Sequence, residues 1–428
     1  MYGAGAAGDA HAESTPVSLQ ALIDAAQPGD EIALQSGRTY AGPATVNKPV
    51  SIVGNGDVTV RNRSDAPALT LRANGVTLQG FRVDDGQSDP KRSVILVRSN
   101  NNRIDGLAIV SQAGGIYLRE ANGNVIVHNR IVGAKAGYQA EPYSKRGNGI
   151  DLLASTGNLI QDNEFVHVHD GVYVESSNET RVIGNKAFDS RYGFHIMFSG
   201  KPELSDNVGS GNVTGGMVMG VEDAVVHGNR FEKQTESVNS QGILLFDVHR
   251  STVEDNRVEG NRVGLYIEKS SDNIFSRNEA LSNFIGIQMI RSEGNTFTEN
   301  VFVSNVIQAQ ATESRNNALD GNYWDDYRGL DVDGDGHSDL PYEIDPFFLK
   351  ITDQVDAYQL FFQAPGLPFL TQLFRDNTDN WLKDSRPLMS PSAGIAGSAA
   401  DRTASVPYAA VLFLASISII YLWGYKNT

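Results

Sequence analysis

A histidine and three of the chain's six methionines fall within one short stretch, residues 195–219. The four residues are His195, Met197, Met217 and Met219, and Met217 follows His195 by 22 residues. Imidazole nitrogen and thioether sulfur both bind transition metals, and soft thioether ligands select Cu(I). These residues can form a Cu(I) site only if the fold brings the two pairs together on one surface.

Asparagine recurs along the chain at a nearly constant spacing, which indicates an internal repeat. Most intervals are 22 residues, and a glycine stands 14 residues before each asparagine up to Asn300. The repeated residues are Asn129, Asn163, Asn185, Asn207, Asn229, Asn256, Asn278, Asn300 and Asn322. In the earlier repeats, we expect Gly54, Gly80 and Gly106 to occupy the asparagine position.

Each repeat contains short segments in which apolar and polar residues alternate, such as "GIYLR", "GVYVE" and "GLYIE". This alternation of apolar and polar residues, in segments bounded by asparagine and glycine, predicts strands and tight turns rather than helices. One coil per repeat gives an all-β fold, a right-handed single-stranded parallel β-helix with coils of about 22 residues. Asparagine tolerates left-handed turns, and its amide can bond to the asparagine of the next coil, so we expect a structural ladder.

Side chains alternate across a strand, so the positions after each repeat glycine divide between two faces. The first and third positions are apolar almost throughout and predict the core, with Phe194, Ile196 and Met289 among them. The second and fourth positions place the four candidate ligands on the outside of two adjacent coils. In the alternative, a loop or a partner covers this face, and the methionines pack with Leu244 and Phe246 as ordinary apolar surface.

Two repeats carry insertions, "GAKAGYQAEPYSKRGN" and "EKQTESVNSQ". We expect both to emerge beside the same outer strand, on either side of the candidate ligands. Loops that rim one face commonly carry recognition. His167 and His169 precede Gly171, so we expect them near this rim, either as further ligands or as exposed turn residues.

An acidic motif follows the last repeated asparagine. Asp331, Asp333 and Asp335 match the D-x-D-x-D-G opening of a calcium loop, with Asp339 at the ninth position. The twelfth position is Tyr342 rather than glutamate, so a helix–loop–helix calcium site is not expected. A calcium-stapled turn and an acidic surface turn that closes the β-helix both fit the motif.

The run "GNYWDDYRGLDVDGDGHSDLPY", the coil repeats and the opening "SLQALIDAAQPGDEIALQSGRTYAGPATVNKPVSIVGNG" together resemble the NosD family. NosD proteins are periplasmic β-helix proteins of nitrous oxide reductase maturation, within the carbohydrate-binding and sugar-hydrolase class of β-helices. The resemblance covers residues 16–390. It implies a NosF/NosY-type ABC transporter as partner, a NosL-type copper donor, and apo nitrous oxide reductase as copper acceptor. It implies no individual ligands, so the copper site depends on the alternation alone.

The alternative function is that of a polysaccharide lyase, epimerase or hydrolase, because this fold hosts many such enzymes. Outward Tyr173 and Glu175, with His195 and with Asp151 one coil below, could abstract a sugar proton. However, few arginines or lysines line the predicted face to hold uronates, and the sequence lacks the D-P-H-E run of alginate epimerases. A scaffold that only bridges partners is the third hypothesis. We expect an accessory protein and not an enzyme.

Composition narrows the partners and the compartment. The formal net charge of −16 argues against nucleic acid, and the lack of cysteine excludes disulfides and thiolate metal sites. Residues 407–425 are almost wholly apolar and long enough to cross a bilayer, although a buried helix would look similar. The resemblance implies a periplasmic location, and the apolar segment adds the expectation that the protein is associated with the cytoplasmic membrane.

The expected segments follow from these patterns. They are a flexible lead at 1–15, the β-helix at 16–346, an aromatic-rich docking segment at 347–390, a linker at 391–406 and a transmembrane helix at 407–425.

Overall fold

A computed structural model of the chain describes residues 16–133, 142–234, 237, 239–344 and 382–391. Among these residues, no helix is long and apolar enough to cross a membrane. Several predicted segments lie outside the described part, namely the lead at 1–15, most of the docking segment, almost all of the linker, and the transmembrane helix at 407–425.

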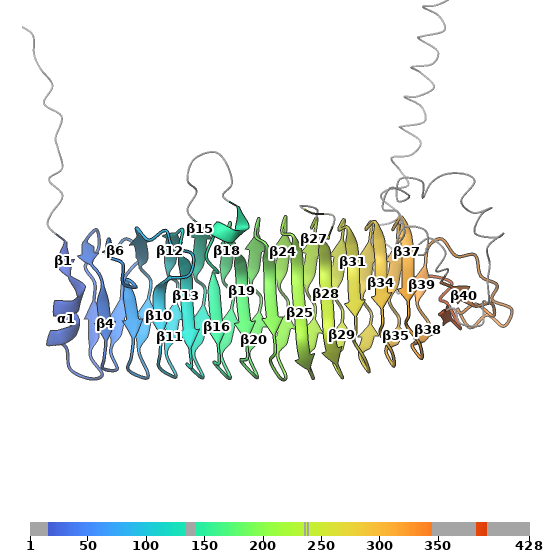
Figure 1. The fold of residues 1–428 in the computed structure, drawn as a ribbon, viewed down its shortest axis with the longest axis horizontal. Coiled ribbons are helices and arrows are strands. Elements are labelled where there is room, and N and C mark those ends of the chain that lie inside the picture. The colour runs from blue at the N-terminus through green and yellow to red at the C-terminus, as the bar shows by residue number, and fades with distance from the viewer. Residues whose placement is uncertain (1–15, 134–141, 235–236, 238, 345–381, 392–428) are drawn as a thin grey trace, which may run out of the picture.

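Short parallel strands, stacked coil upon coil, build the described chain into a β-solenoid (Figure 1). The strands form three sheets of 14, 12 and 15 strands. From β1 to β39, strands that follow one another in sequence lie in different sheets, whereas strands one repeat apart pair in parallel. The last two strands, β40 and β41, lie in one sheet and pair antiparallel. The all-β parallel fold predicted from the repeat and the alternation is therefore confirmed.

The fourteen-stranded sheet contains β1 (Val17–Ser18), β3 (Thr39–Ala41), β6 (Thr59–Asn62), β9 (Arg82–Asp85), β12 (Ala108–Ser111), β15 (Arg130–Gly133), β18 (Glu164–Val166), β21 (Lys186–Phe188), β24 (Val208–Ser210), β27 (Arg230–Glu232), β30 (Arg257–Glu259), β33 (Glu279–Leu281), β36 (Val301–Val303) and β39 (Tyr323–Trp324). The twelve-stranded sheet contains β4 (Ala44–Val46), β7 (Leu69–Leu71), β10 (Ser93–Val97), β13 (Gly114–Arg119), β16 (Ile150–Leu153), β19 (Asp170–Glu175), β22 (Tyr192–Met197), β25 (Thr214–Glu222), β28 (Gln241–His249), β31 (Val263–Glu268), β34 (Ile285–Ile290) and β37 (Ile307–Thr312). The fifteen-stranded sheet contains β2 (Glu31–Ala33), β5 (Ser51–Val53), β8 (Thr77–Gln79), β11 (Arg103–Asp105), β14 (Val125–Val127), β17 (Leu159–Gln161), β20 (Arg181–Ile183), β23 (Glu203–Ser205), β26 (Val225–His227), β29 (Thr252–Glu254), β32 (Ile274–Ser276), β35 (Thr296–Thr298), β38 (Ala318–Asp320), β41 (Lys383–Asp384) and β40 (Tyr342–Glu343).

Two short helices accompany the strands. The α-helix α1 (Leu19–Ala25) lies at the N-terminal end of the solenoid (Figure 1), and its buried Leu19 and Ile23 pack into the core. The Ser18 hydroxyl accepts a hydrogen bond from the Ala21 N–H and so caps the first turn. The 3₁₀ helix η1 (Tyr143–Lys145) lies in the first of the two insertions.

The core follows the predicted alternation. In the twelve-stranded sheet, Phe194, Ile196 and Met289 are all buried, as expected for first and third positions after a repeat glycine. Aromatic side chains also stack between coils, and the rings of Phe275 and Phe297 lie 4.5 Å apart and nearly parallel. Each coil therefore buries its apolar row against the coils before and after it.

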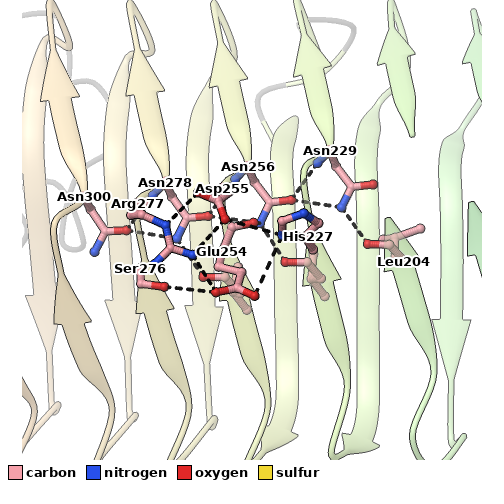
Figure 2. Close-up of polar contacts among 12 residues, drawn as sticks. Leu204, His227, Asn229, Glu254, Asp255, Asn256, Ser276, Arg277, Asn278 and Asn300 are labelled. Atoms are coloured by element: carbon pink, nitrogen blue, oxygen red, sulfur yellow. Dashed lines mark hydrogen bonds and ion pairs between the residues drawn. The ribbon is translucent and has the colours of Figure 1, made fainter. Parts of the chain in front are cut away.

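The repeated asparagines form the expected ladder, part of which Figure 2 shows. The side-chain amide of Asn185 donates to the Oδ1 of Asn207 at 3.1 Å, and that of Asn278 donates to Asn300 at 2.9 Å. The backbone N–H of Asn185 donates to the same Oδ1 of Asn207 at 2.9 Å. These buried asparagines hold adjacent coils in register, which confirms their structural role.

One detail of the ladder differs from the prediction. The left-handed residue is the one before each asparagine, as at Asp206, where φ is 56°. Gly106 has φ of 64° and is such a turn residue, whereas the N–H of Leu107 donates to the Oδ1 of Asn129 at 2.9 Å. Leu107 therefore occupies the asparagine position, and the assignment of the early glycines to that position is wrong by one residue.

A carboxylate ends the ladder at the C-terminal side. Asp384 on β41 is fully buried and accepts hydrogen bonds from the side-chain amide of Asn322 at 2.9 Å and from the indole N–H of Trp324 at 3.0 Å. It also accepts the backbone N–H of Asn322 at 2.9 Å. Asp384 thus takes the place that the next asparagine would have, and the segment around residue 384 closes the last coil.

Candidate metal centre on the twelve-stranded sheet

The four predicted copper ligands lie on two paired strands, β22 and β25. In the parallel register, His195 is opposite Met217 and Met197 is opposite Met219. Because Phe194, Ile196 and Val218 between them are buried in the core, the ligand row lies on the outer face. The three methionines are partly exposed. The fold therefore places all four candidate donors on one surface of adjacent coils.

His195 is more enclosed than the sequence indicated. The residue is only 5% exposed, although it belongs to the outer row. Its ring packs edge-on against Tyr173 of the preceding coil, at 5.0 Å between centroids, and against Tyr192, at 4.9 Å. Two aromatic neighbours on the outer face thus shield the imidazole from water.

A buried carboxylate fixes the orientation of the imidazole. The Nδ1 of His195 lies 3.0 Å from the Oδ2 of Asp170, which has no exposed surface. Arg191 donates to the same carboxylate twice, from Nε at 2.8 Å and from Nη2 at 2.6 Å. Burial alone would raise the pKa of Asp170, but the hydrogen bonds from His195 and Arg191 outweigh burial and hold that pKa below its ordinary value. Asp170 is therefore an anion that accepts a proton-bearing Nδ1.

The other ring nitrogen of His195 has no partner. Its Nε2 is buried and lacks a hydrogen bond within the described part of the chain. When a carboxylate holds the Nδ1–H of a neutral imidazole, the lone pair of Nε2 remains for another ligand. Carboxylate–histidine–metal arrangements use this geometry. An orphaned and oriented nitrogen of this kind fits a metal ligand.

Thioether and aromatic side chains continue the outer face beyond His195. Met217 is opposite Leu244 of β28, Met219 is opposite Phe246, and all four side chains are partly exposed. Phe198 just after β22 is 54% exposed. Paired strands lie about 4.8 Å apart, and a methionine side chain is long and flexible enough to cover that distance. Met217 can therefore bring its sulfur to the imidazole of the adjacent strand.

The predicted rim histidines differ in their surroundings. His169 lies next to Asp170 in sequence, and its Nδ1 donates to the carbonyl oxygen of Tyr143 at 2.7 Å. Burial is the main cause that lowers the pKa of His169, and the nearby Arg191 charge adds to the effect. The described end of the first insertion thus lies beside the His195 site. His167 instead has its Nδ1 3.8 Å from Asp189, at a turn with φ of 57°.

The residues proposed for sugar chemistry are already engaged. The Tyr173 hydroxyl donates to Glu175 at 2.8 Å, and Asp151 pairs with Arg119 at 2.7 Å. Burial, followed by Glu175, raises the pKa of Tyr173 well above its ordinary value. Tyr173 consequently keeps its proton at neutral pH, which is the wrong state for a general base.

A basic pocket on the same face was not predicted. A cavity of about 420 Å³ opens beside β10 and β13, and Lys91, Arg92, Arg98 and Arg119 line it together with Tyr117. The expectation that few basic residues line this face is therefore wrong for these coils. The sequence pattern missed the pocket because Lys91 and Arg92 precede β10 and lie outside the alternating positions.

The acidic motif forms a compact loop. Carboxylate oxygens of Asp331, Asp333 and Asp335 come within 4.8 Å of one another. Asp331 accepts the N–H of Gly334 at 2.6 Å, and Asp335 pairs with Arg386 at 2.6 Å. The fourth predicted ligand, Asp339, instead accepts the backbone N–H of Val332 at 2.8 Å. Calcium binding by this loop stays a prediction.

Two of the comparisons with known proteins point to NosD proteins. The family model described as "Periplasmic copper-binding protein (NosD)" matches residues 138–329, which include all four candidate ligands. A Pseudomonas aeruginosa protein named "Probable ABC transporter binding protein NosD" is 28% identical over 425 residues, covering 83% of this chain and 87% of that protein. A cell surface glycoprotein of Methanothermus fervidus is 27% identical over 158 residues, which are 32% of this chain and 26% of that protein.

A solved structure is similar in fold. A PL6 alginate lyase in complex with a trisaccharide superposes with a TM-score of 0.50 at 13% identity, covering 67% of this chain and 82% of that one. At this identity the similarity shows a shared solenoid architecture and nothing about activity.

Proposed function

Because the chain is a NosD-type β-helix protein, we propose that it binds copper in the periplasm and transfers it for maturation of the copper centres of nitrous oxide reductase. The copper-binding description of the matching family supports this proposal. The name of the Pseudomonas relative supports an association with an ABC transporter, here of the NosF/NosY type. In this scheme a NosL-type protein donates copper, and apo nitrous oxide reductase receives it. Copper is thus the cargo of this protein and not a catalytic cofactor.

The copper site of this proposal consists of the Nε2 of His195 and the thioethers of Met217, Met197 and Met219. The orphaned Nε2 is the observation that carries it, because Asp170 holds the opposite nitrogen and leaves this lone pair unused. Thioether sulfurs favour Cu(I) over harder divalent ions. Arg191 balances the charge of Asp170, so the carboxylate behind His195 adds no net negative charge to the site.

The site chemistry suits transfer better than storage. The chain contains no cysteine, so no thiolate can hold Cu(I) permanently. The methionines are partly exposed at the surface, whereas the His195 nitrogen lies beneath. An incoming ion therefore meets the thioethers first and the imidazole second, and the reverse order releases it to a partner that docks on this face.

A Cu(I) titration of the full chain against a chromogenic competitor tests the proposed ligands. The combined Met197→Ala, Met217→Ala and Met219→Ala variant should lose high-affinity binding while its far-ultraviolet spectrum stays that of the parent. Met389→Ala is the matched control, because Met389 is also partly exposed, at 40%, and lies in the C-terminal segment. If the triple variant binds Cu(I) like the parent, the ligands are elsewhere.

Membrane association is part of the proposal. Residues 407–425 would anchor the chain on the periplasmic side of the cytoplasmic membrane and keep the copper site near the transporter. Tethering of this kind raises the effective concentration of the two partners without any new contact. The segment lies outside the described residues, so its support is the apolar sequence alone.

A polysaccharide lyase, epimerase or hydrolase is the second candidate, favoured by the basic pocket. Lys91, Arg92, Arg98 and Arg119 line one cavity together with Asp65 and Glu120, and the excess of positive charge there could hold carboxylated sugars. Tyr173, the residue predicted to abstract a proton, lies outside this pocket and keeps its own proton, which argues against the enzyme. Incubation with alginate and pectin discriminates the two functions. Shortened, unsaturated or epimerised products would show that the protein is an enzyme. Unchanged polymer would favour the accessory function.

A further inference from the structure

We propose that His227, Glu254 and Asp255 form a separate site for a divalent transition-metal ion, for which Zn²⁺ is the probe. His227 ends β26 and Glu254 ends β29, and the two are opposite each other in the parallel register. Asp255 follows Glu254 at a turn with φ of 56°. Figure 2 shows the three side chains directed toward one another on the fifteen-stranded sheet.

The spacing of the donor atoms fits one bound ion. The Nδ1 of His227 lies 3.5 Å from the Oδ2 of Asp255 and 3.8 Å from the Oε1 of Glu254. Zinc binds nitrogen and oxygen at about 2.0–2.2 Å, so two ligands of a tetrahedral site lie about 3.4 Å apart. The observed separations are too long for hydrogen bonds and close to this value. A water molecule would complete the fourth position.

The imidazole nitrogen that faces the carboxylates lacks a hydrogen bond within the described part of the chain. The Nδ1 of His227 is buried and makes no hydrogen bond with the described residues, although its side chain as a whole is 42% exposed. His128, at the turn just after β14 of the same sheet, behaves differently, since its Nδ1 lies 3.0 Å from Asp105. The His227 nitrogen is therefore oriented toward two anionic oxygens with an unused bonding capacity.

Arg277 orients the two carboxylates from the opposite side. It donates to the Oε2 of Glu254 at 2.8 Å, to the Oδ2 of Asp255 at 2.8 Å and to the Oδ1 of Asp255 at 2.8 Å. These bonds leave the Oε1 of Glu254 facing His227. The hydrogen bond from Arg277 is the largest cause that lowers the pKa of Asp255, which keeps this carboxylate ionised. Groups that hydrogen-bond to metal ligands from behind commonly hold those ligands in the orientation needed for binding.

The chemical type of its ligands distinguishes this site from the proposed Cu(I) site at His195, Met197, Met217 and Met219. An imidazole with two carboxylates prefers divalent ions such as Zn²⁺ and Cu²⁺, whereas thioethers prefer Cu(I). The two sets of residues also lie on different sheets of the solenoid. Binding at one site therefore does not depend on the proposed function of the other.

Isothermal titration of the full chain with Zn²⁺ tests the site. His227→Ala and Glu254→Gln should each weaken binding at one site by at least tenfold, because each removes a ligand. His128→Ala and the triple methionine variant should bind Zn²⁺ like the parent. With Cu²⁺ as a second probe, electron paramagnetic resonance should show a nitrogen coupling that His227→Ala removes. The proposal is overturned if the parent binds no Zn²⁺, or if His227→Ala leaves affinity and stoichiometry unchanged.

Discussion

The Nδ1 of His195 lies 3.0 Å from the Oδ2 of Asp170, a carboxylate with no exposed surface and two hydrogen bonds from Arg191. This relationship fixes which nitrogen of the imidazole carries the proton. It also explains how a histidine that is 95% buried can keep an unpartnered Nε2, because the ring cannot turn to satisfy it without breaking the bond to Asp170.

Replacement of Asp170 should weaken copper binding without removing any proposed ligand. In Asp170→Asn the ring of His195 loses its anionic acceptor, and changes of this kind typically cost 10–100-fold in metal affinity. Competitive Cu(I) titration measures the loss. Asp105→Asn is the matched control, because Asp105 holds the Nδ1 of His128 at the same distance of 3.0 Å, away from the methionines. If Asp170→Asn binds Cu(I) with the same affinity as the parent, Asp170 does not orient His195 for copper binding.

The lowered pKa of Asp170 predicts a pH dependence of stability. The folded state favours the ionised carboxylate, so its contribution is fully present above the ordinary pKa of about 3.9 and is lost as the pH falls through the lower folded-state pKa. The difference in unfolding free energy between the parent and Asp170→Asn should therefore shrink as the pH falls below about 4. Urea unfolding at a series of pH values measures it, and a difference that stays constant down to pH 2 would contradict the assignment.

Alanine substitution at neighbouring positions of β22 should lower stability by very different amounts. Ile196 is buried between coils, so Ile196→Ala should lower the free energy of unfolding by about 2–5 kcal/mol. Met197 is partly exposed on the outer face, so Met197→Ala should cost less than about 1 kcal/mol. Chemical denaturation of the two variants provides the comparison. A larger loss for Met197→Ala than for Ile196→Ala would mean that a core contact of Met197 has been overlooked.

Truncation after Ser405 tests the proposed anchor. The shortened protein should leave the membrane fraction, should still bind copper, and should support reductase maturation less well than the full chain. Cell fractionation in a strain without the transporter provides the measurement. If the truncated protein stays with the membrane under these conditions, residues 407–425 are not the anchor.

Periodicity explains why so much of the fold was predictable. Alternation assigned Met217 to the outer face and Met289 to the core, and burial agrees with both assignments. The 22-residue spacing also gave the asparagine ladder. The 26-residue spacing of Gly54, Gly80 and Gly106 led to the wrong assignment in the early coils. The 22-residue interval before Asn129 falls on Leu107, whereas Gly106 precedes Asn129 by 23 residues.

The enclosure of His195 could not be read from the same pattern. Asp170 and Tyr192 are the first residues of β19 and β22, and they precede the repeat glycines. The predicted outer row begins only after each glycine, so it did not include them. The His227 cluster was missed for a related reason, because Asp255 lies at a turn and His227 meets Glu254 and Asp255 only through the stacking of two coils.

X-ray absorption spectroscopy of the Cu(I)-loaded full chain shows directly which atoms bind the ion. We expect sulfur and a single imidazole nitrogen in the first coordination shell, with the sulfur contribution lost in the triple methionine variant and the nitrogen contribution lost in His195→Ala. A first shell of nitrogen and oxygen only, unchanged by either substitution, would contradict copper binding between β22 and β25.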